Sequence, residues 1–119
     1  MRIITNEIKG TFIIYKMYVI INGKIYVGKT TIPIYMRINI HRHGKLDADK
    51  YFASIGWENV VFEIIDWSND RTNLLKMEDE QIRKHFKMYE NKVLNKYSTQ
   101  PVYFRIHKEF KKLANNFFE

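Results

Sequence analysis

The sequence predicts an α+β domain in which a small three-stranded antiparallel sheet is flanked by helices. Residues 11–21 and 24–28 are rich in β-branched and aromatic side chains, and the Asn-Gly dipeptide between them is the strongest short signal for a β-hairpin. A third such stretch, 59–66, follows two short helical patterns, and a longer helical pattern at 71–89 comes after it. This order, β-β-α-α-β-α, is typical of an α+β domain.

Residues that start and stop helices bound the predicted helices. A threonine pair and Pro33 favour a helix start near residue 33, and Gly44 ends that helix. The second helix, 47–55, ends at Gly56 in the same way. In the longer helix apolar residues recur at helical spacing, so one of its faces should pack on the sheet. These residues are Leu74, Leu75, Ile82, Phe86 and Tyr89.

Residues 101–119 are predicted to add an extra C-terminal strand and helix. Residues 102–106 have the composition of a short strand, and Phe110, Leu113 and Phe117 share one face of the helix after it. The segment adds four basic residues, Arg105, Lys108, Lys111 and Lys112. The three lysines could follow a DNA backbone, but the amphipathic pattern favours a helix that covers the sheet with its lysines in water.

The composition narrows the class of protein. A chain of 119 residues allows one domain. The absence of cysteine excludes disulfides, cysteine-ligated zinc and thiol nucleophiles, and it fits a reducing intracellular compartment. No apolar run approaches the length of a membrane-spanning helix, and the first ten residues are charged where a signal peptide needs an apolar segment. We therefore expect a small soluble intracellular domain with no membrane partner; its compartment stays open.

The net charge of +7 is unevenly distributed along the chain. Residues 1–44 and 81–119 are each strongly basic, whereas residues 45–80 are acidic. If the two basic segments come together in the fold, they form one positive surface, which is the electrostatic signature of a protein that binds a polyanion. Charge alone is a weak signal, so a nucleic-acid partner needs support from residues that could act on a phosphate.

Two tyrosines of the predicted hairpin project from the same face of the sheet. With a two-residue turn, Tyr15 opposes Thr30 and Val19 opposes Tyr26, which places the tyrosines four residues apart along the strands, roughly 13 Å. A tyrosine in a strand usually packs its ring and leaves its hydroxyl in water. On this ground alone, a structural role is the better interpretation for both.

Polar residues on two helices carry further possibilities. Arg37 and His41 are four apart and share a helix face, where they could hold a phosphate and assist proton transfer, although a solvated polar face is the simpler interpretation. Glu78 stands on the apolar stripe of the long helix, and a carboxylate facing a core costs several kcal/mol unless it is paired or binds a metal. A salt bridge, for example to Arg37, and a Mg²⁺ ligand are both open.

The spacing of these residues resembles that of the GIY-YIG nucleases. Tyr15 is followed eleven residues later by Tyr26, which opens a Tyr-Val-Gly triplet. Arg37 follows eleven residues after Tyr26, and His41 comes four residues later, as in the family. Glu78 opens a segment of the long helix much as the metal-binding glutamate of the family does. Random chains rarely satisfy all five positions together.

The resemblance covers residues 11–96, about the size of a whole catalytic module. Residues 52–62 also resemble the helix-to-strand segment of the family, and Asn95 resembles the asparagine that closes its Gly-Tyr-Asn element. The chain departs from the pattern at Ile13, where the first motif has a glycine, and at Val27, where the second has an isoleucine. Both substitutions suit a strand and leave the tyrosines in place.

Residues 1–119 are expected to form a single domain, and the resemblance implies that its 11–96 module hydrolyses DNA phosphodiester bonds with Mg²⁺ or Mn²⁺. Glu78 would hold the single metal ion. Tyr15 would accept the proton of the attacking water, directly or through a relay, with Tyr26 or His41 assisting. Arg37 would bind the non-bridging oxygens of the phosphate as charge grows on them. No organic cofactor is implied, and the oligomeric state is open.

The remaining implied roles concern the surroundings of the site. Asn95 would steady the glutamate or a water, and Lys24, Lys29 and Arg42 would contact nucleic acid. Because a tyrosine near pKa 10 is a poor base at neutral pH, Lys24, Lys29 and Arg37 are expected to lower that pKa. Two alternatives stay open: a catalytically inactive basic nucleic-acid-binding domain of the same fold, and a domain that binds acidic protein partners.

Overall fold

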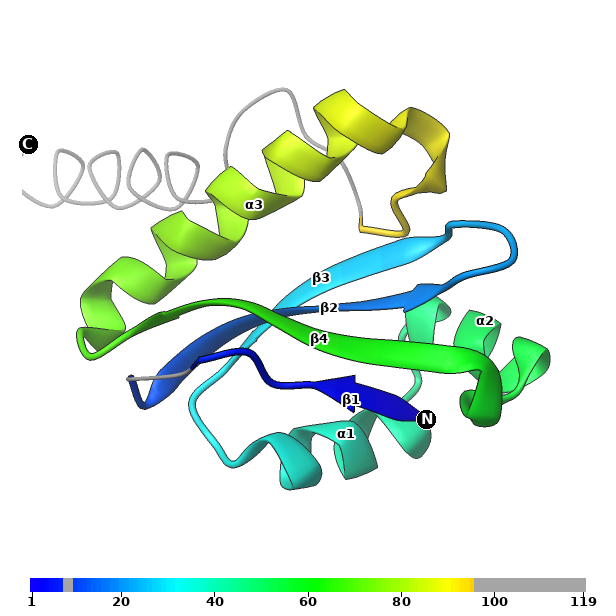
Figure 1. Ribbon diagram of the computed structural model, residues 1–119, viewed down its shortest axis with the longest axis horizontal. Coiled ribbons are helices and arrows are strands. Elements are labelled where there is room, and N and C mark those ends of the chain that lie inside the picture. Colours follow the sequence, from blue (N-terminus) through cyan, green and yellow to red (C-terminus); the bar gives the residue numbers. More distant parts are fainter. Residues whose placement is uncertain (8–9, 96–119) are drawn as a thin grey trace, which may run out of the picture.

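In the computed structural model, a four-stranded sheet is covered by helices on both faces (Figure 1). The structure describes residues 1–7 and 10–95. The strands lie side by side in the order β1-β4-β2-β3, with β3 at one edge and β1 at the other. Their bounds are Arg2–Ile4 for β1, Phe12–Val19 for β2, Ile25–Thr30 for β3 and Val60–Ser68 for β4.

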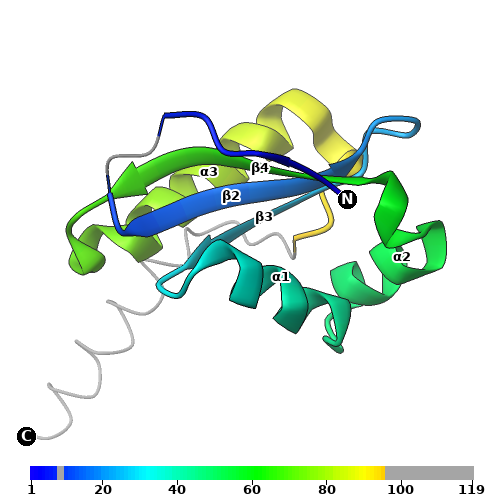
Figure 2. The same ribbon diagram turned by 60° about the horizontal axis from the view of Figure 1, so that its bottom comes forward.

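The three helices form two layers. Helices α1 and α2 cover one face of the sheet, and α3 covers the other (Figure 2). Their bounds are Ile34–Arg42 for α1, Asp47–Ile55 for α2 and Leu74–Tyr89 for α3. Short 3₁₀ turns at Trp57–Asn59, Arg71–Asn73 and Glu90–Lys92 flank them. The three helices predicted before residue 90 are confirmed to within a few residues, as is the α+β class. Within the described residues, the helices are too short or too polar to span a bilayer.

The sheet differs from the predicted one at its N-terminal edge. The three-residue strand β1 pairs in parallel with β4, so the sheet has four strands and is mixed rather than antiparallel. A three-residue strand between polar residues carries no alternating pattern long enough to be recognised in the sequence. The extra strand and helix predicted for residues 101–119 lie outside the described residues.

The hairpin of β2 and β3 also differs in register. Residues 20–24 form a longer turn than the predicted Asn-Gly pair, closed by a hydrogen bond from the Gly23 N–H to the Val19 carbonyl at 2.8 Å. Tyr15 therefore opposes Gly28, and Met17 opposes Tyr26. The predicted pairing of Tyr15 with Thr30 is wrong by two residues. Because the shift is even, both tyrosines still share a face, and they lie two residues apart along the strands instead of four, about 7 Å.

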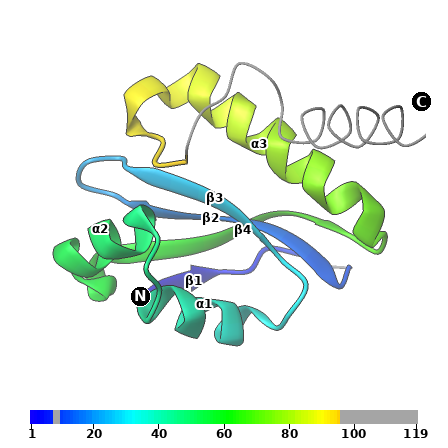
Figure 3. The ribbon, with the colours of Figure 1, turned by 180° about the vertical axis from the view of Figure 1, so that it is seen from behind.

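Alternation along the strands builds one apolar core on each face of the sheet. On the side of α1 and α2, inward residues of β2 and β4 pack with Ile38 and Phe52. On the side of α3, Ile14, Ile25 and Val27 pack with Leu74. Seen from behind (Figure 3), β3 lies between α3 and the pair of α1 and α2. As an edge strand, β3 is therefore the place where side chains from both layers can meet.

Candidate active site

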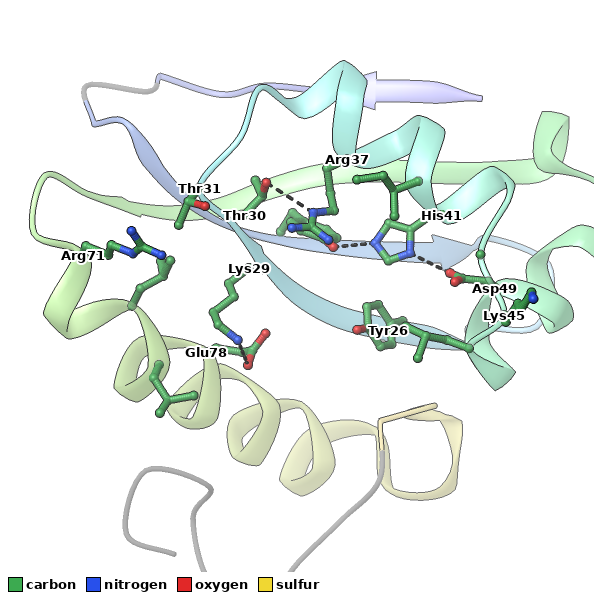
Figure 4. Close-up of a pocket in the computed structure, with 16 residues that line it drawn as sticks. Tyr26, Lys29, Thr30, Thr31, Arg37, His41, Lys45, Asp49, Arg71 and Glu78 are labelled. Atoms are coloured by element: carbon green, nitrogen blue, oxygen red, sulfur yellow. Dashed lines mark hydrogen bonds and ion pairs between the residues drawn. The ribbon is translucent and has the colours of Figure 1, made fainter. Parts of the chain in front are cut away.

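A cleft of about 660 Å³ lies along β3, between the two helical layers. Figure 4 shows residues of α1, β3 and α3 pointing into it. It is lined by five of the six residues predicted to be catalytic, although they come from four different elements and from segments up to 63 positions apart. They are Tyr15 from β2, Tyr26 from β3, Arg37 and His41 from α1, and Glu78 from α3.

The alternation of β3 explains how the two layers reach one cleft. Tyr26 packs with the core on the side of α1 and α2, and Val27 packs with the core on the side of α3. Lys29 stands on the same face as Val27 and reaches α3, where it bonds Glu78. If β3 were a central strand, the next strand would separate the side chains on one face of the sheet from those on the other. Because β3 is an edge strand, side chains from both faces can border the same cleft.

Tyr15 is held rigidly in the core with only its hydroxyl directed at the site. It is 1% exposed, and its ring stacks on Phe62 with centroids 4.6 Å apart. A Cβ added at Gly28, directly opposite on β3, would lie 2.5 Å from the hydroxyl oxygen of Tyr15. The glycine of the Tyr-Val-Gly triplet is therefore required by the close approach of the other tyrosine rather than by backbone conformation.

A chain of two short hydrogen bonds leads from Tyr15 through His41 to Asp49. The hydroxyl of Tyr15 lies 2.5 Å from Nε2 of His41, and Nδ1 of His41 lies 2.6 Å from Oδ1 of Asp49. A carboxylate can only accept, so Nδ1 carries the proton, and Nε2 accepts from the hydroxyl of Tyr15. Burial lowers the pKa of His41, and Asp49 opposes that shift. The imidazole is therefore neutral and has its free lone pair towards the tyrosine.

Asp49 is not among the residues predicted for the site, although the sequence contains a signal for it. Asp49 lies beside Ala48 and three residues before Phe52, both buried on the inner face of α2, so a helical projection places it on that face. It is 3% exposed. A carboxylate at such a position requires a partner, by the reasoning that singled out Glu78.

The pKa values of the two tyrosines shift in the opposite direction from the one expected. Burial raises the pKa of Tyr15 well above its usual range, and Tyr26 adds to that shift while Arg37 opposes it. Burial raises the pKa of Tyr26 to about 12. The expectation that neighbouring cations lower these values is wrong, because removing a phenolate from water outweighs the charge of Arg37. Neither hydroxyl is ionised near neutral pH.

Arg37 is half-buried at the mouth of the cleft and is oriented by Thr30. Its Nε donates to Oγ1 of Thr30 at 3.3 Å, and Thr30 is itself fixed by accepting from the backbone N–H of Ile32 at 3.2 Å. Thr30 was predicted to cap α1, but the helix has no side-chain cap and begins after Pro33. The hydroxyl of Thr30 holds the guanidinium instead (Figure 4).

Glu78 projects from α3 into the cleft and is paired with Lys29. Its Oε1 accepts from Nζ of Lys29 at 3.1 Å, and its side chain is 16% exposed. The cation partner is therefore Lys29 rather than Arg37. Lys29, predicted to contact nucleic acid, lines the cleft (Figure 4).

Three other predicted residues do not line this cleft. The side-chain amide of Asn95 makes two hydrogen bonds with the backbone of Val27. Its Oδ1 accepts from the Val27 N–H at 2.9 Å, and its Nδ2 donates to the Val27 carbonyl at 2.8 Å. It thus ties the chain to the free edge of β3, and a role in steadying Glu78 has no support from its position. Lys24 donates to the Asn91 carbonyl at 3.3 Å, and Arg42 is exposed in the last turn of α1.

Two exposed cations that the sequence analysis did not single out do line the cleft. Figure 4 shows Lys45 and Arg71 towards opposite ends of it, with Arg37 and Glu78 between them. Lys45 lies in the connection between α1 and α2, and Arg71 lies in the 3₁₀ turn before α3. Neither belongs to a motif, so only the fold brings them to the site. Among the charged residues that line the cleft, the four basic ones, Lys29, Arg37, Lys45 and Arg71, therefore outnumber Glu78 and the buried Asp49.

The cleft combines a buried phenol, a neutral imidazole, an oriented guanidinium and a shielded carboxylate, which are groups suited to attack on a phosphate. Comparison with known proteins gives one match: residues 11–99 fit the family described as the GIY-YIG catalytic domain. No curated protein and no solved structure matches the chain significantly. Since the matched segment spans most of the chain and contains every element that lines the cleft, the chain belongs to the GIY-YIG catalytic domain family, a family of nucleases.

Proposed function

We propose that the protein is a metal-dependent endonuclease that hydrolyses DNA phosphodiester bonds in the cleft along β3. The observation that carries the proposal is the convergence of Tyr15, Arg37 and Glu78 on one cleft from three separate elements. A structural role for each residue alone does not account for their meeting, because the packing of the two apolar cores does not require these three polar groups to face one space. The cationic lining matches a polyanionic substrate.

Each group in the cleft has a role that its surroundings support. The guanidinium of Arg37, held by Thr30, would bind the non-bridging oxygens of the phosphate and stabilise the charge that grows there. Because the pKa of Tyr15 is raised, its phenol would not act as a phenolate. Instead, the hydroxyl would take the proton of the attacking water while passing its own proton to Nε2 of His41.

The residues present fit a single hard cation. Glu78 offers one largely shielded carboxylate at the cleft, and the described residues contain no group of three or more side chains that could hold a metal by themselves. Mg²⁺ commonly takes one or two carboxylates and completes its shell with waters and phosphate oxygens, which matches this arrangement. A divalent cation bound there would polarise the phosphate and stabilise the leaving 3′ oxygen.

Lys29 competes with such a cation for the carboxylate of Glu78. Replacing Lys29 with methionine should therefore tighten the binding of Mn²⁺ to the protein without DNA, by about two- to fivefold, because a partly exposed ion pair contributes up to roughly 1 kcal/mol. Isothermal titration calorimetry measures the affinity. Lys24→Met, which removes a cation of the same hairpin outside the cleft, should leave it unchanged. Unaltered or weaker binding in Lys29→Met would contradict the competition.

Supercoiled plasmid tests the proposal against its alternatives. With Mg²⁺ the protein should convert plasmid to nicked or linear forms, and with EDTA it should not. Arg37→Ala should slow cutting by about 10²- to 10³-fold with little loss of DNA affinity. Arg42→Ala removes an exposed arginine of the same helix that lies outside the cleft, and it should leave the cutting rate of bound DNA unchanged even if it weakens DNA binding. DNA binding that weakens with salt, without cutting, would instead indicate an inactive binding domain. Failure to bind DNA at moderate salt would favour a protein partner.

A further inference from the structure

Asp49 is the last member of the hydrogen-bonded chain and has no part in the function as proposed so far. The residues Asp49, His41 and Tyr15 are each at most 3% exposed. The contacts of 2.5 Å and 2.6 Å join the three groups in one line from α2 through α1 to β2. A buried carboxylate is costly unless it is paired, so its place behind the imidazole requires a reason.

We propose that Asp49 is a positioning residue for the cutting reaction, which holds His41 in the tautomer that accepts a proton from Tyr15 and stabilises the imidazolium formed when it does. This inference rests on the proposed nuclease function. The water proton moves to the Tyr15 oxygen, and the tyrosine proton moves to Nε2 of His41. The remaining hydroxide forms the new bond to phosphorus, the bond to the 3′ oxygen breaks, and that oxygen takes a proton from a second water.

The geometry around Asp49 favours this role over simple packing. The loop between α1 and α2 brings Gly44 so close to Asp49 that a Cβ at position 44 would overlap Oδ2 and the carboxylate carbon. The φ angle of Gly44 is not in the left-handed region, so this glycine serves the approach of the carboxylate. The fold thus makes room at two places, Gly28 beside Tyr15 and Gly44 beside Asp49, at the two ends of the same chain of hydrogen bonds.

The charged and titratable groups around His41 predict in which direction its pKa shifts when Asp49 is replaced. The titratable or charged groups that face it are Tyr15 from β2, Tyr26 from β3, Arg37 from its own helix and Asp49 from α2. Burial and Arg37 lower the pKa of His41, and Asp49 alone among these raises it. Removing the charge of Asp49 should therefore lower that pKa further, which makes His41 a weaker proton acceptor.

The test is Asp49→Asn, compared with the wild type in single-turnover cleavage of DNA with Mg²⁺ across a range of pH. The asparagine keeps the size of the side chain, but it can donate to Nδ1 as readily as accept, so the tautomer is no longer fixed. We expect the plateau rate to fall by about a hundredfold or more, with unchanged DNA affinity. Because the reaction needs neutral His41, the acidic limb of the pH profile should move to lower pH.

Asp79→Asn is the matched control, since Asp79 is 6% exposed on α3 and paired with Arg83 outside the chain of hydrogen bonds. The Asp79→Asn variant should lose about as much stability as Asp49→Asn, while the acidic limb of its pH profile should stay at the wild-type position. Gly44→Ala is the second variant: it should slow cutting by displacing the carboxylate without changing any charge. An Asp49→Asn variant that cuts at the wild-type rate, or slows only in proportion to its unfolded fraction with an unmoved limb, would overturn the proposal.

A readout independent of cutting separates this inference from the proposed function. Nitrogen NMR of His41 should show a proton on Nδ1 and a bare Nε2 in the wild type, and a loss of that preference in Asp49→Asn. If the wild type does not cut DNA, the nuclease function fails, and the catalytic part of the inference fails with it. If the wild type cuts but its His41 carries the proton on Nε2, the proposed function stands and the role of Asp49 is overturned.

Discussion

Glu78→Gln is expected to reduce Mg²⁺-dependent DNA cutting by at least about a thousandfold. The amide has nearly the shape of the carboxylate but lacks its charge, so Glu78→Gln would no longer hold the divalent cation proposed to stabilise the leaving oxygen. Such stabilisation amounts to several kcal/mol, and each 1.36 kcal/mol is about tenfold in rate. Single-turnover cleavage of labelled DNA measures the loss, and a gel-shift titration should show DNA affinity at or above the wild-type value because a negative charge has left the cleft.

Glu80→Gln is the control for Glu78→Gln. Glu80 lies two residues further along α3, is exposed and does not line the cleft. Its replacement makes the same chemical change on the same helix and should leave the cleavage rate within about twofold, since surface charges outside such sites usually have small effects. Equal losses in the two variants, or normal cutting by Glu78→Gln, would remove Glu78 from the proposed metal site.

Tyr15→Phe is expected to slow cutting by about 10²- to 10⁴-fold, the range typical of a lost general acid–base group. The phenylalanine keeps the stack on Phe62, so the core should remain packed. It leaves Nε2 of His41 without its donor, which should cost about 1–3 kcal/mol of stability. Cleavage rates and the midpoint of thermal unfolding, measured on the same preparation, separate the two effects.

Tyr18→Phe provides the comparison for Tyr15→Phe. Tyr18 is on the same strand but on the opposite face of the sheet, where its hydroxyl donates to Glu63 at 3.1 Å. Losing that bond should lower stability slightly and leave the cleavage rate unchanged. If both variants cut at the same rate, the hydroxyl of Tyr15 has no part in the reaction.

The sequence predicts local features of this fold well because they depend on neighbouring residues. The helix α2 begins and ends as expected, since its start and the stop at Gly56 are encoded within ten residues, 47–56. The face shared by Tyr15 and Tyr26 also follows from strand alternation, which an even shift of register preserves. The spacing of the polar residues was enough to place five of them around one cleft.

The features that the sequence does not predict depend on contacts between distant segments. The register of the hairpin depends on a turn that spans residues 20–24, and the Asn-Gly pair indicates a shorter one. The pairing of Lys29 with Glu78, rather than Arg37, depends on where α3 crosses β3. Burial raises the tyrosine pKa values, and the depth of burial cannot be read from nearby cations in the chain.

Asn95 illustrates why a motif position does not determine a role. Its amide imitates a strand partner for Val27, next to the bridge that joins Ile25 and Val93. An edge strand leaves backbone groups unpaired, and a side-chain amide at the end of the described chain satisfies one pair of them. Asn95 would then affect the cleft only indirectly, by holding β3 in place.

The most direct test of the central claim is a crystal structure of Glu78→Gln bound to a DNA that the wild-type protein cuts with Mg²⁺. A phosphodiester should lie in the cleft along β3, with a non-bridging oxygen within hydrogen-bond distance of the Arg37 guanidinium and the Tyr15 hydroxyl facing the phosphorus. DNA bound to another surface, with no phosphate within reach of these two side chains, would contradict the account.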